Sequence, residues 1–232
     1  MPVDYMEIIY WSLFAFLAAG YVFVRFIFKM DKKHPARDWI TVGFEAMIIA
    51  TLLRTFVLQT FMVPTGSMEN TIKIGDHPIA LKYQYGIYNP FSDSLVFSFS
   101  KPQRGEVVIF RDPRPGSNIM MIKRVVGIPG DVIEIKLKQL FVNGKYPDET
   151  YKIHKDNRML PAIVSYRDSL GPVTVPEGHY FVMGDNRDFS GDSRSFGFLP
   201  EKNLRGKAAL IYWPPKNIGL IRHERDVFKL VN

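Results

Sequence analysis

The apolar residues of this 232-residue chain are concentrated at its beginning. Residues Ile8 to Val24 contain no charged side chain, and the run continues past Arg25 to residue 28. About 20 apolar residues cross the hydrocarbon core of a bilayer, and an arginine near the end of the run can reach the interface. The pattern predicts a membrane-spanning helix over about residues 8–28. No small-x-small cleavage site follows it, so we interpret it as an anchor and not a removable leader.

A second apolar segment, about residues 39–55, is shorter and contains Glu45. It fits either a second span or a helix lying on the membrane surface. The loop before it is basic and the N-terminal tail has no Lys or Arg, which places the loop in the cytoplasm. Its basic residues are Arg25, Lys29, Lys32, Lys33 and Arg37. We favour two spans, with residues 1–60 as a membrane anchor and residues 61–232 as an extracytoplasmic domain.

Beyond residue 60 the pattern changes to short runs rich in β-branched and aromatic residues, at 107–110, 119–126, 131–135, 139–142, 179–183 and 207–213. Turn signals separate them, such as Asn143-Gly144 and Pro129-Gly130. This spacing predicts a mainly β fold, an antiparallel barrel-like or sandwich-like domain preceded by the helical hairpin. The polar stretch at its centre predicts a smaller inserted β subdomain at about 137–180.

Composition excludes several kinds of site. The chain has no cysteine, which rules out disulfides, thiolate zinc sites and cysteine nucleophiles. The net charge of +7 is compatible with nucleic acid or an anionic membrane. The basic residues outside the loop are dispersed and no nucleic-acid-binding motif is present, so we expect no nucleic-acid partner.

A candidate nucleophile lies in the segment VPTGSMEN, residues 63–70. Gly66 allows a tight turn from which Ser67 can project, although a serine in such a turn is usually structural. A serine hydroxyl needs a base before it becomes a nucleophile. The chain has five histidines, none in a recognisable triad setting, but sequence order cannot exclude a histidine base because triad partners meet only in space.

The alternative base is Lys123, in the apolar run IMMIKRVVG. In a strand it would share a face with Met121 and Val125, and burial would favour its neutral amine. The alternative is an edge-strand lysine whose ammonium group reaches water.

A third segment, GDNRDFSGDSRSFG at 184–197, groups acidic and basic residues around glycine turns. It begins like a calcium-binding EF-hand loop, but the twelfth position is Gly197, where a bidentate glutamate is required. A structural salt-bridged turn and a turn that positions a hydroxyl both remain open. No metal or organic cofactor is expected.

Four segments, in the order VPTGSMENTIKIGD, RGEVVIFRDP, IKRVVGIPGD and MGDNRDFSGDSR, resemble the bacterial type I signal peptidases, or leader peptidases. The resemblance extends over nearly the whole chain and implies a serine endopeptidase with a Ser–Lys dyad. Asn70 departs from the proline that many members carry, a change from which we expect little. Thr65 departs from a frequent serine and keeps the hydroxyl.

The resemblance implies roles for individual residues. Ser67 would be the nucleophile and Lys123 the general base. The Ser67 backbone N–H and the Thr65 hydroxyl would form the oxyanion hole, and Ser190 would orient the Lys123 amine. The remaining implied residues support the site (Gly184, Asp185, Asp192, Arg194) or line substrate pockets (Phe61, Val63, Pro64, Ile72, Met121, Ile122).

The implied reaction removes N-terminal signal peptides from exported preproteins by cutting after a small residue. The implied location is the bacterial cytoplasmic (inner) membrane, as a multi-pass protein near the secretion translocon. The alternative is a catalytically inactive membrane-anchored binding protein on the same scaffold. A β-lactamase-type site is excluded because Asn70, not lysine, stands three residues after Ser67. A self-cleaving repressor is disfavoured by the apolar N-terminus.

Overall fold

The computed structural model describes residues 5–23, 35–88, 95–98 and 100–231. The chain divides into two compact units, Met1–Thr55 and Phe56–Asn232. This boundary lies five residues before the one at 60/61 that the sequence suggested.

The first unit is a pair of helices, α1 (Tyr5–Val22) and α2 (Pro35–Phe56). The ring of Phe44 in α2 stacks on Tyr21 at 4.7 Å and lies 6.3 Å from Phe14, so the two helices pack on each other. Most of the basic loop predicted between them falls in residues 24–34, outside the described residues. Across the residues that the structure describes, neither helix offers a stretch long and apolar enough to cross a membrane.

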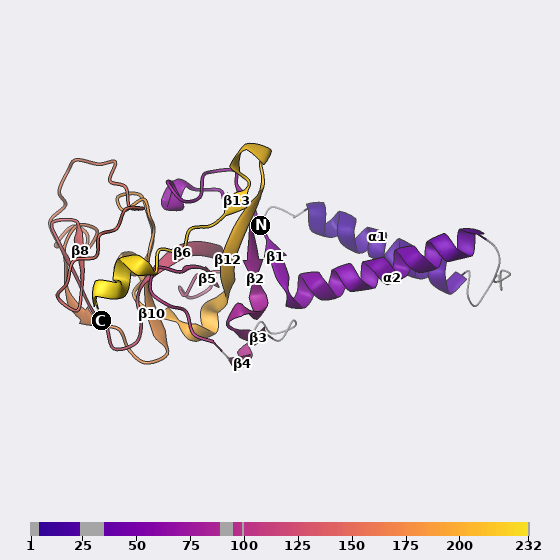
Figure 1. Ribbon diagram of the computed structural model, residues 1–232, viewed down its shortest axis with the longest axis horizontal. Coiled ribbons are helices and arrows are strands. Elements are labelled where there is room, and N and C mark those ends of the chain that lie inside the picture. The colour runs from indigo at the N-terminus through magenta and orange to yellow at the C-terminus, as the bar shows by residue number, and fades with distance from the viewer. Residues whose placement is uncertain (1–4, 24–34, 89–94, 99, 232) are drawn as a thin grey trace. The chain divides into compact units, whose positions relative to one another are not determined.

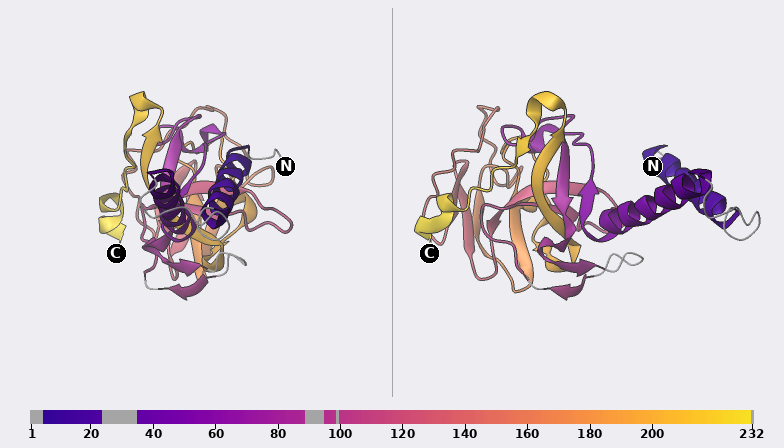
Figure 2. Two further views of the ribbon diagram at one scale, coloured as in Figure 1. Left: turned by 90° about the vertical axis from the view of Figure 1, so that its right-hand side faces the viewer. Right: turned by 45° about the vertical axis from the view of Figure 1, so that its right-hand side comes forward.

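The second unit is built on an eight-stranded sheet in the order β1-β2-β12-β5-β6-β10-β11, with β13 paired to β12. Figure 1 labels most of these strands, and Figure 2 shows the same unit from two further sides. All its pairings are antiparallel. The strands are β1 (Leu58–Thr60), β2 (His77–Leu81), β5 (Val107–Arg111), β6 (Met120–Gly127), β10 (His179–Met183), β11 (Leu199–Pro200), β12 (Leu204–Trp213) and β13 (Gly219–Leu220). Among the described strands β1 and β11 are free ends of the sheet, so the predicted barrel is not closed.

Two smaller sheets complete the unit. One pairs β3 (Gly86–Tyr88) with β4 (Leu95–Ser98), and the other has the order β8-β7-β9. Its strands are β7 (Val132–Lys136), β8 (Gln139–Val142) and β9 (Leu170–Thr174), of which β8 and β9 lie inside the predicted excursion at 137–180 and β7 precedes it. The short helices are α3 (Ser193–Phe196), η2 (Gly66–Met68), η3 (Lys82–Gln84), η4 (Glu201–Asn203), η5 (Pro215–Asn217) and η6 (Asp226–Val231).

The six β runs read from the sequence correspond to β5, β6, β7, β8, β10 and all of β12 except its first three residues. The Asn143-Gly144 turn is confirmed, with φ of 52° and 75°, but it leads only into an isolated bridge between Val142 and Lys145. The β7–β8 hairpin turns instead at Leu137-Lys138, with φ of 49° and 68°. Non-glycine residues rarely adopt such angles, so no local pattern of residues marked this turn.

Three apolar clusters fill the interior of the second unit. One combines Val63, Met68 and Ile72 with Val107, Ile109 and Ile122 of the main sheet. A second lies between β6, β10 and the three-stranded sheet, and a third on β5, β6 and β10 beside β11 and β12. The first cluster fixes the segment around residue 67 against β6, and this contact positions the site described next.

Candidate active site

Ser67 lies in the one-turn helix η2, directly before Met68, which is fully buried in the first apolar cluster. Ser67 itself is 7% exposed. Thr65 precedes the turn in an extended conformation and does not cap it with its side chain. The buried methionine fixes the turn to the core, and the serine hydroxyl is held at the edge of that core.

Lys123 reaches Ser67 from the middle of β6. Its Nζ lies 2.8 Å from Ser67 Oγ and 2.9 Å from the carbonyl oxygen of Ile122, and the residue is only 3% exposed. The edge-strand interpretation, with the ammonium group in water, is therefore wrong. The buried amine forms a direct hydrogen bond with the hydroxyl that it would have to deprotonate.

Burial lowers the pKa of Lys123 from 10.5 to about 8. Removing the ammonium group from water disfavours its charged form. The carboxylates of Asp192 and Asp185 act in the opposite direction, and the guanidinium of Arg194 lowers the pKa further. A substantial fraction of neutral amine is therefore present at mildly alkaline pH.

Asp192 and Arg194 form a buried ion pair beside this amine, with Arg194 Nη2 donating to Asp192 Oδ2 at 2.7 Å. Asp192 also accepts a hydrogen bond from the Gly184 N–H at 3.0 Å and caps α3. Burial acts to raise the pKa of Asp192, but Arg194 and these hydrogen bonds hold it below its ordinary value. Asp192 therefore stays ionised close to Lys123, with its negative charge balanced by Arg194.

Asp185 forms a second buried ion pair, with Arg124, the neighbour of Lys123 on β6. Arg124 donates from Nε at 2.9 Å and from Nη2 at 2.7 Å, and neither side chain is exposed. Arg124 also donates to the carbonyl oxygens of Gly105 and Arg222. Sequence reasoning passed over Arg124, although it lies inside the segment IKRVVG.

A further buried pair joins Arg187 to Glu149, whose side chains are 1% and 0% exposed. The Tyr151 hydroxyl donates to Glu149 at 2.6 Å, and the Arg124 guanidinium lies 4.0 Å from the Tyr151 ring centroid. Arg187 lies inside the segment MGDNRD, but Glu149 and Tyr151 come from a polar stretch with no recognisable motif. Only the fold brings them to the site.

The histidines in the described part of the chain interact elsewhere. Burial lowers the pKa of His223 to about 4. The ring centroids of His77 and Tyr212 lie 5.8 Å apart. His154 Nδ1 lies 3.2 Å from Asp188 Oδ1, and His179 Nδ1 lies 2.9 Å from Glu177 O. His223 Nδ1 accepts a hydrogen bond from Val107 N–H at 3.1 Å. His34 lies outside the described residues. Of the described residues, the base in contact with Ser67 is a lysine.

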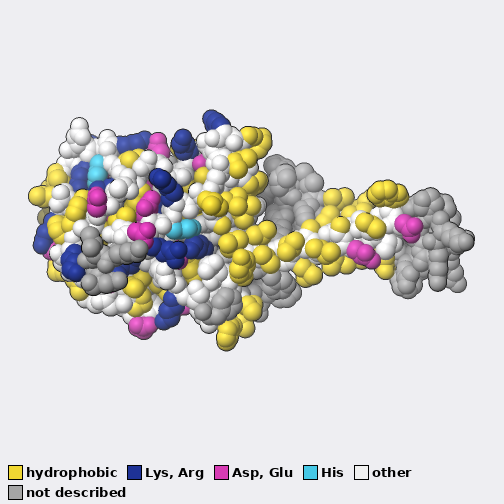
Figure 3. Space-filling view, in the orientation of Figure 1, with side chains coloured by type: hydrophobic (Ala, Val, Ile, Leu, Met, Phe, Trp, Pro, Cys, Tyr) yellow, Lys and Arg dark blue, Asp and Glu magenta, His cyan; other side chains and the backbone are white. Residues whose placement is uncertain are grey.

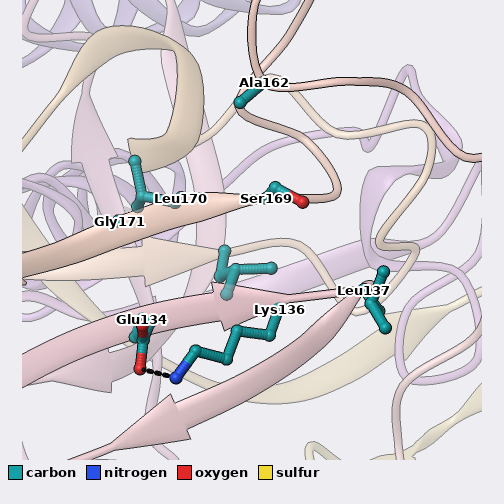
Figure 4. Close-up of a pocket in the computed structure, with 8 residues that line it drawn as sticks. Glu134, Lys136, Leu137, Ala162, Ser169, Leu170 and Gly171 are labelled. Atoms are coloured by element: carbon teal, nitrogen blue, oxygen red, sulfur yellow. Dashed lines mark ion pairs between the residues drawn. The ribbon is translucent and has the colours of Figure 1, made fainter.

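A separate shallow cavity of about 360 Å³ lies on the three-stranded sheet. It is lined by residues 134–137 and 169–171 together with Ala162, and a 2.8 Å ion pair joins Lys136 to Glu134 at its wall (Figure 4). None of these residues belongs to the Ser67 site.

Comparison with known proteins decides the family. Residues 36–213 match the profile described as "Signal peptidase, peptidase S26". The chain belongs to this family. Signal peptidase I of Pseudomonas aeruginosa is 36% identical over 230 residues, covering 85% of this chain and 80% of that protein. The corresponding protein of Pseudomonas fluorescens is 37% identical over 218 residues, covering 80% and 76%.

Two further matches extend the range of organisms. A probable signal peptidase I-2 of Synechocystis is 34% identical over 210 residues, covering 88% of this peptidase and 86% of its relative. A crystal structure of a signal peptidase I from Enterococcus faecalis has 34% sequence identity and a TM-score of 0.37, covering 47% of this chain and 98% of that one.

The structure of this peptidase brings Ser67, Lys123, Gly184, Asp185, Asp192 and Arg194 together. Ser190 is different: its hydroxyl is buried without a hydrogen bond of normal geometry to the described residues, although it helps to lower the pKa of Asp192. Asn70 has φ of 97°, which proline cannot adopt, and its Nδ2 donates to Tyr151 O at 2.9 Å. Asn70 therefore has a backbone conformation that proline would exclude.

The predicted pocket residues separate into two groups. Val63, Ile72 and Ile122 belong to the apolar core and are 2%, 0% and 6% exposed. Phe61 and Met121 are half-buried, and Pro64 is exposed. Phe61 packs against the cluster that holds the first group, whereas Met121 packs against the third cluster, on the opposite face of β6 from Ile122.

Gly184 lies so close to the segment around Ser67 that we expect Gly184→Ala to lower the activity of the peptidase strongly. An added Cβ would lie 2.5 Å from Ser67 O and would also collide with Ser190 Oγ, so the backbone at Ser67 would have to move. A displacement of about 1 Å can reduce a rate roughly 10²-fold, and we expect a loss of at least that size in kcat/KM. Gly191→Ala is the control, because its Cβ would meet nothing within 4 Å. Equal activity of both variants would show that the close approach of Gly184 to Ser67 does not matter for cleavage.

Proposed function

We propose that this peptidase removes signal peptides from exported preproteins with Ser67 as nucleophile and Lys123 as general base. The observation that supports this most is the 2.8 Å contact between a buried lysine amine and the Ser67 hydroxyl. A lysine base must be neutral at working pH, and its pKa of about 8 meets that requirement. No specific observation favours the inactive binding-protein alternative.

The proposed reaction has two stages. Ser67 Oγ attacks the scissile carbonyl carbon while its proton passes to Lys123 Nζ. The ammonium group then donates that proton to the leaving amine, and the acyl-enzyme remains. In the second stage Lys123 accepts a proton from water, the resulting hydroxide attacks the ester, and the proton returns to Ser67 Oγ as the C–O bond breaks.

The proposed oxyanion hole consists of the Ser67 N–H and the Thr65 hydroxyl. Thr65 is exposed, extended and not engaged in capping η2, which leaves its hydroxyl available to a substrate. One such donor commonly contributes about 3–4 kcal/mol to transition-state stabilisation. Ser190 remains a proposed orienting residue for Lys123, since its buried hydroxyl lies beside Gly184.

The proposed substrate position is an extended strand beside residues 61–65 and 119–123. On one side β6 pairs with β5 along its first five residues, Met120 to Arg124. On the other side β10 pairs only with Arg124, Val125 and Gly127, so the described strands leave the edge at 120–123 open. An added peptide strand can use that edge. Phe61, Pro64 and Met121 would contact the small side chains before the cut, with Val63, Ile72 and Ile122 buried in the cluster against which Phe61 packs.

We also propose that the chain is anchored in the bacterial cytoplasmic membrane by a hairpin of α1 and α2, with the catalytic unit on the extracytoplasmic face and near the translocon. The uncharged run at 8–24 and the basic residues that follow it support this. A second support is an apolar surface on the catalytic unit over β12 and β13 (Figure 3). Its exposed residues include Trp213, Ile218 and Leu220, and such surfaces mark interaction sites.

The test is cleavage of a purified secretory preprotein by the full chain in detergent at mildly alkaline pH. Wild type should cut once, after a small residue, whereas Ser67→Ala and Lys123→Ala should not cut. Retained cleavage by Ser67→Ala would remove the proposed nucleophile, and retained cleavage by Lys123→Ala would require another base.

A further inference from the structure

Asn186 donates hydrogen bonds to the carbonyl oxygens of Gly66 and Ser67, which lie on either side of the nitrogen and Cα of Ser67. Its Nδ2 donates to Gly66 O at 3.1 Å, and its backbone N–H donates to Ser67 O, also at 3.1 Å. The residue is 3% exposed, and 120 positions separate it from Gly66 in the sequence. One side chain and one N–H of the GDN turn thus fix two consecutive peptide groups of η2.

The first of these peptide groups carries the proposed oxyanion donor. Gly66 C=O and Ser67 N–H belong to one planar trans peptide, so they point in opposite directions. Any tilt of the carbonyl tilts the N–H by the same angle. Gly66 O also accepts from Glu69 N at 3.1 Å, but that bond lies within the turn itself and moves with it. Asn186 supplies the tie from outside the turn.

The side-chain oxygen of Asn186 indicates that asparagine serves function at this position and not stability. Asn186 Oδ1 is buried and has no hydrogen-bond partner among the described residues. An unpaired buried acceptor typically costs about 1–3 kcal/mol. A residue of similar shape without polar atoms would avoid that cost, so the value of asparagine here lies in its donor.

The position of Asn186 is itself fixed from behind. Ile153 forms an isolated parallel bridge with it, in which Ile153 N donates to Asp185 O at 2.8 Å and Arg187 N donates to Ile153 O at 3.0 Å. The neighbours Asp185 and Arg187 are each held in a buried ion pair. The amide is therefore attached to a rigid turn and can set the orientation of a peptide group.

We propose that Asn186 is a positioning residue that aims the Ser67 N–H at the developing oxyanion, by holding the Gly66 carbonyl. This rests on the proposed Ser–Lys mechanism and adds to it a residue that does not touch substrate. Preorganised donors cost no reorganisation during the reaction, and this is the source of their effect on rate.

The decisive variant is Asn186→Leu, which keeps the approximate shape and removes both the donor and the unpaired oxygen. We expect kcat for a peptide substrate to fall roughly 10- to 100-fold, less than the 10²–10³ commonly lost when an oxyanion donor is removed outright. KM should be unchanged. The affinity for a peptide aldehyde, which forms a tetrahedral adduct with the serine, should fall by the same factor as kcat.

Two readouts separate positioning from a structural role. The midpoint of thermal unfolding should be unchanged or raised, because the unpaired acceptor is removed. The pH dependence of kcat/KM should keep its midpoint near 8, because Lys123 is not altered. The matched control is Asn203→Leu, which removes a similar Nδ2 bond, to Arg111 O at 3.0 Å, and should leave all kinetic values unchanged.

The proposal is wrong if kcat of Asn186→Leu equals that of wild type, or if kcat falls without a matching loss of aldehyde affinity. Asn186→Ala gives the same readouts should the leucine variant fail to fold. Ser67→Ala, measured in parallel, distinguishes failure of the proposed mechanism from failure of the proposed role of Asn186. Cleavage by Ser67→Ala would remove the proposed mechanism itself. An inert Ser67→Ala beside a fully active Asn186→Leu would remove only the role of Asn186.

Discussion

Lys123→Met should abolish signal-peptide cleavage and at the same time stabilise the folded protein at neutral pH. Methionine has a similar length but cannot accept the proton of Ser67. In serine proteases, removing the nucleophile or the base lowers kcat by as much as about 10⁶-fold, and we expect a loss of at least roughly 10⁴-fold here. A cleavage assay with a preprotein measures this first effect.

The second effect follows from the burial of the amine. Burial lowers the Lys123 pKa from 10.5 to about 8, which corresponds to roughly 3 kcal/mol of lost stability while the group is charged. Below pH 8 both folded and unfolded chains carry the proton, and the cost is complete. Between pH 8 and 10.5 the unfolded chain binds more protons, so wild-type stability rises with pH. The methionine variant should be more stable by up to about 3 kcal/mol at pH 7, and this difference should vanish above pH 10.5.

Denaturant unfolding of both proteins from pH 7 to pH 10.5 measures this difference. Lys202→Met, at an exposed lysine, is the control and should change neither stability nor cleavage. The kcat/KM of wild type should rise with pH through a midpoint near 8, as expected when a neutral amine is required. An inactive Lys123→Met that is less stable than wild type at pH 7 would contradict the burial argument. A midpoint below pH 6 would contradict a lysine base.

Glu149→Ala should destabilise the catalytic unit by roughly 3–5 kcal/mol, because it leaves the Arg187 guanidinium buried and unpaired. Both side chains of this pair are almost fully buried. The Glu149 pKa is held low by Arg187 and the Tyr151 hydroxyl, against the effect of burial, so the carboxylate is charged at neutral pH. Because Arg187 follows Asn186 directly, cleavage activity should fall together with stability.

The control for Glu149→Ala is Glu177→Ala, at an ion pair with Lys101 whose side chains are 82% and 61% exposed. Exposed pairs contribute about 0–1 kcal/mol, so this variant should unfold almost like wild type. The double variant Glu149→Leu with Arg187→Met should recover much of the lost stability, because it buries no charge. If Glu149→Ala loses no more stability than Glu177→Ala, the buried pair does not stabilise the fold.

The β architecture could be predicted from the sequence because each strand is encoded locally. Short runs of β-branched and aromatic residues between turn signals predicted β5, β6, β7, β8 and β10 to within about one or two residues. The hairpin at Leu137-Lys138 was not predictable. Lys138 Nζ lies 2.9 Å from Asp188 Oδ1, and this contact across 50 positions helps to hold a turn that local preferences disfavour.

The sequence by itself determined the family and predicted Ser67 and Lys123 as the central residues, because the order and spacing of four short segments survive in the one-dimensional pattern. The tertiary structure alone decided the rest of the site. Burial of Lys123 depends on the segment around Ser67 closing over β6. Asn186 contacts Gly66 across 120 positions of the sequence, and Glu149 contacts Arg187 across 38. Hydrogen bonding and desolvation depend on distance in space, and no local pattern of residues records those distances.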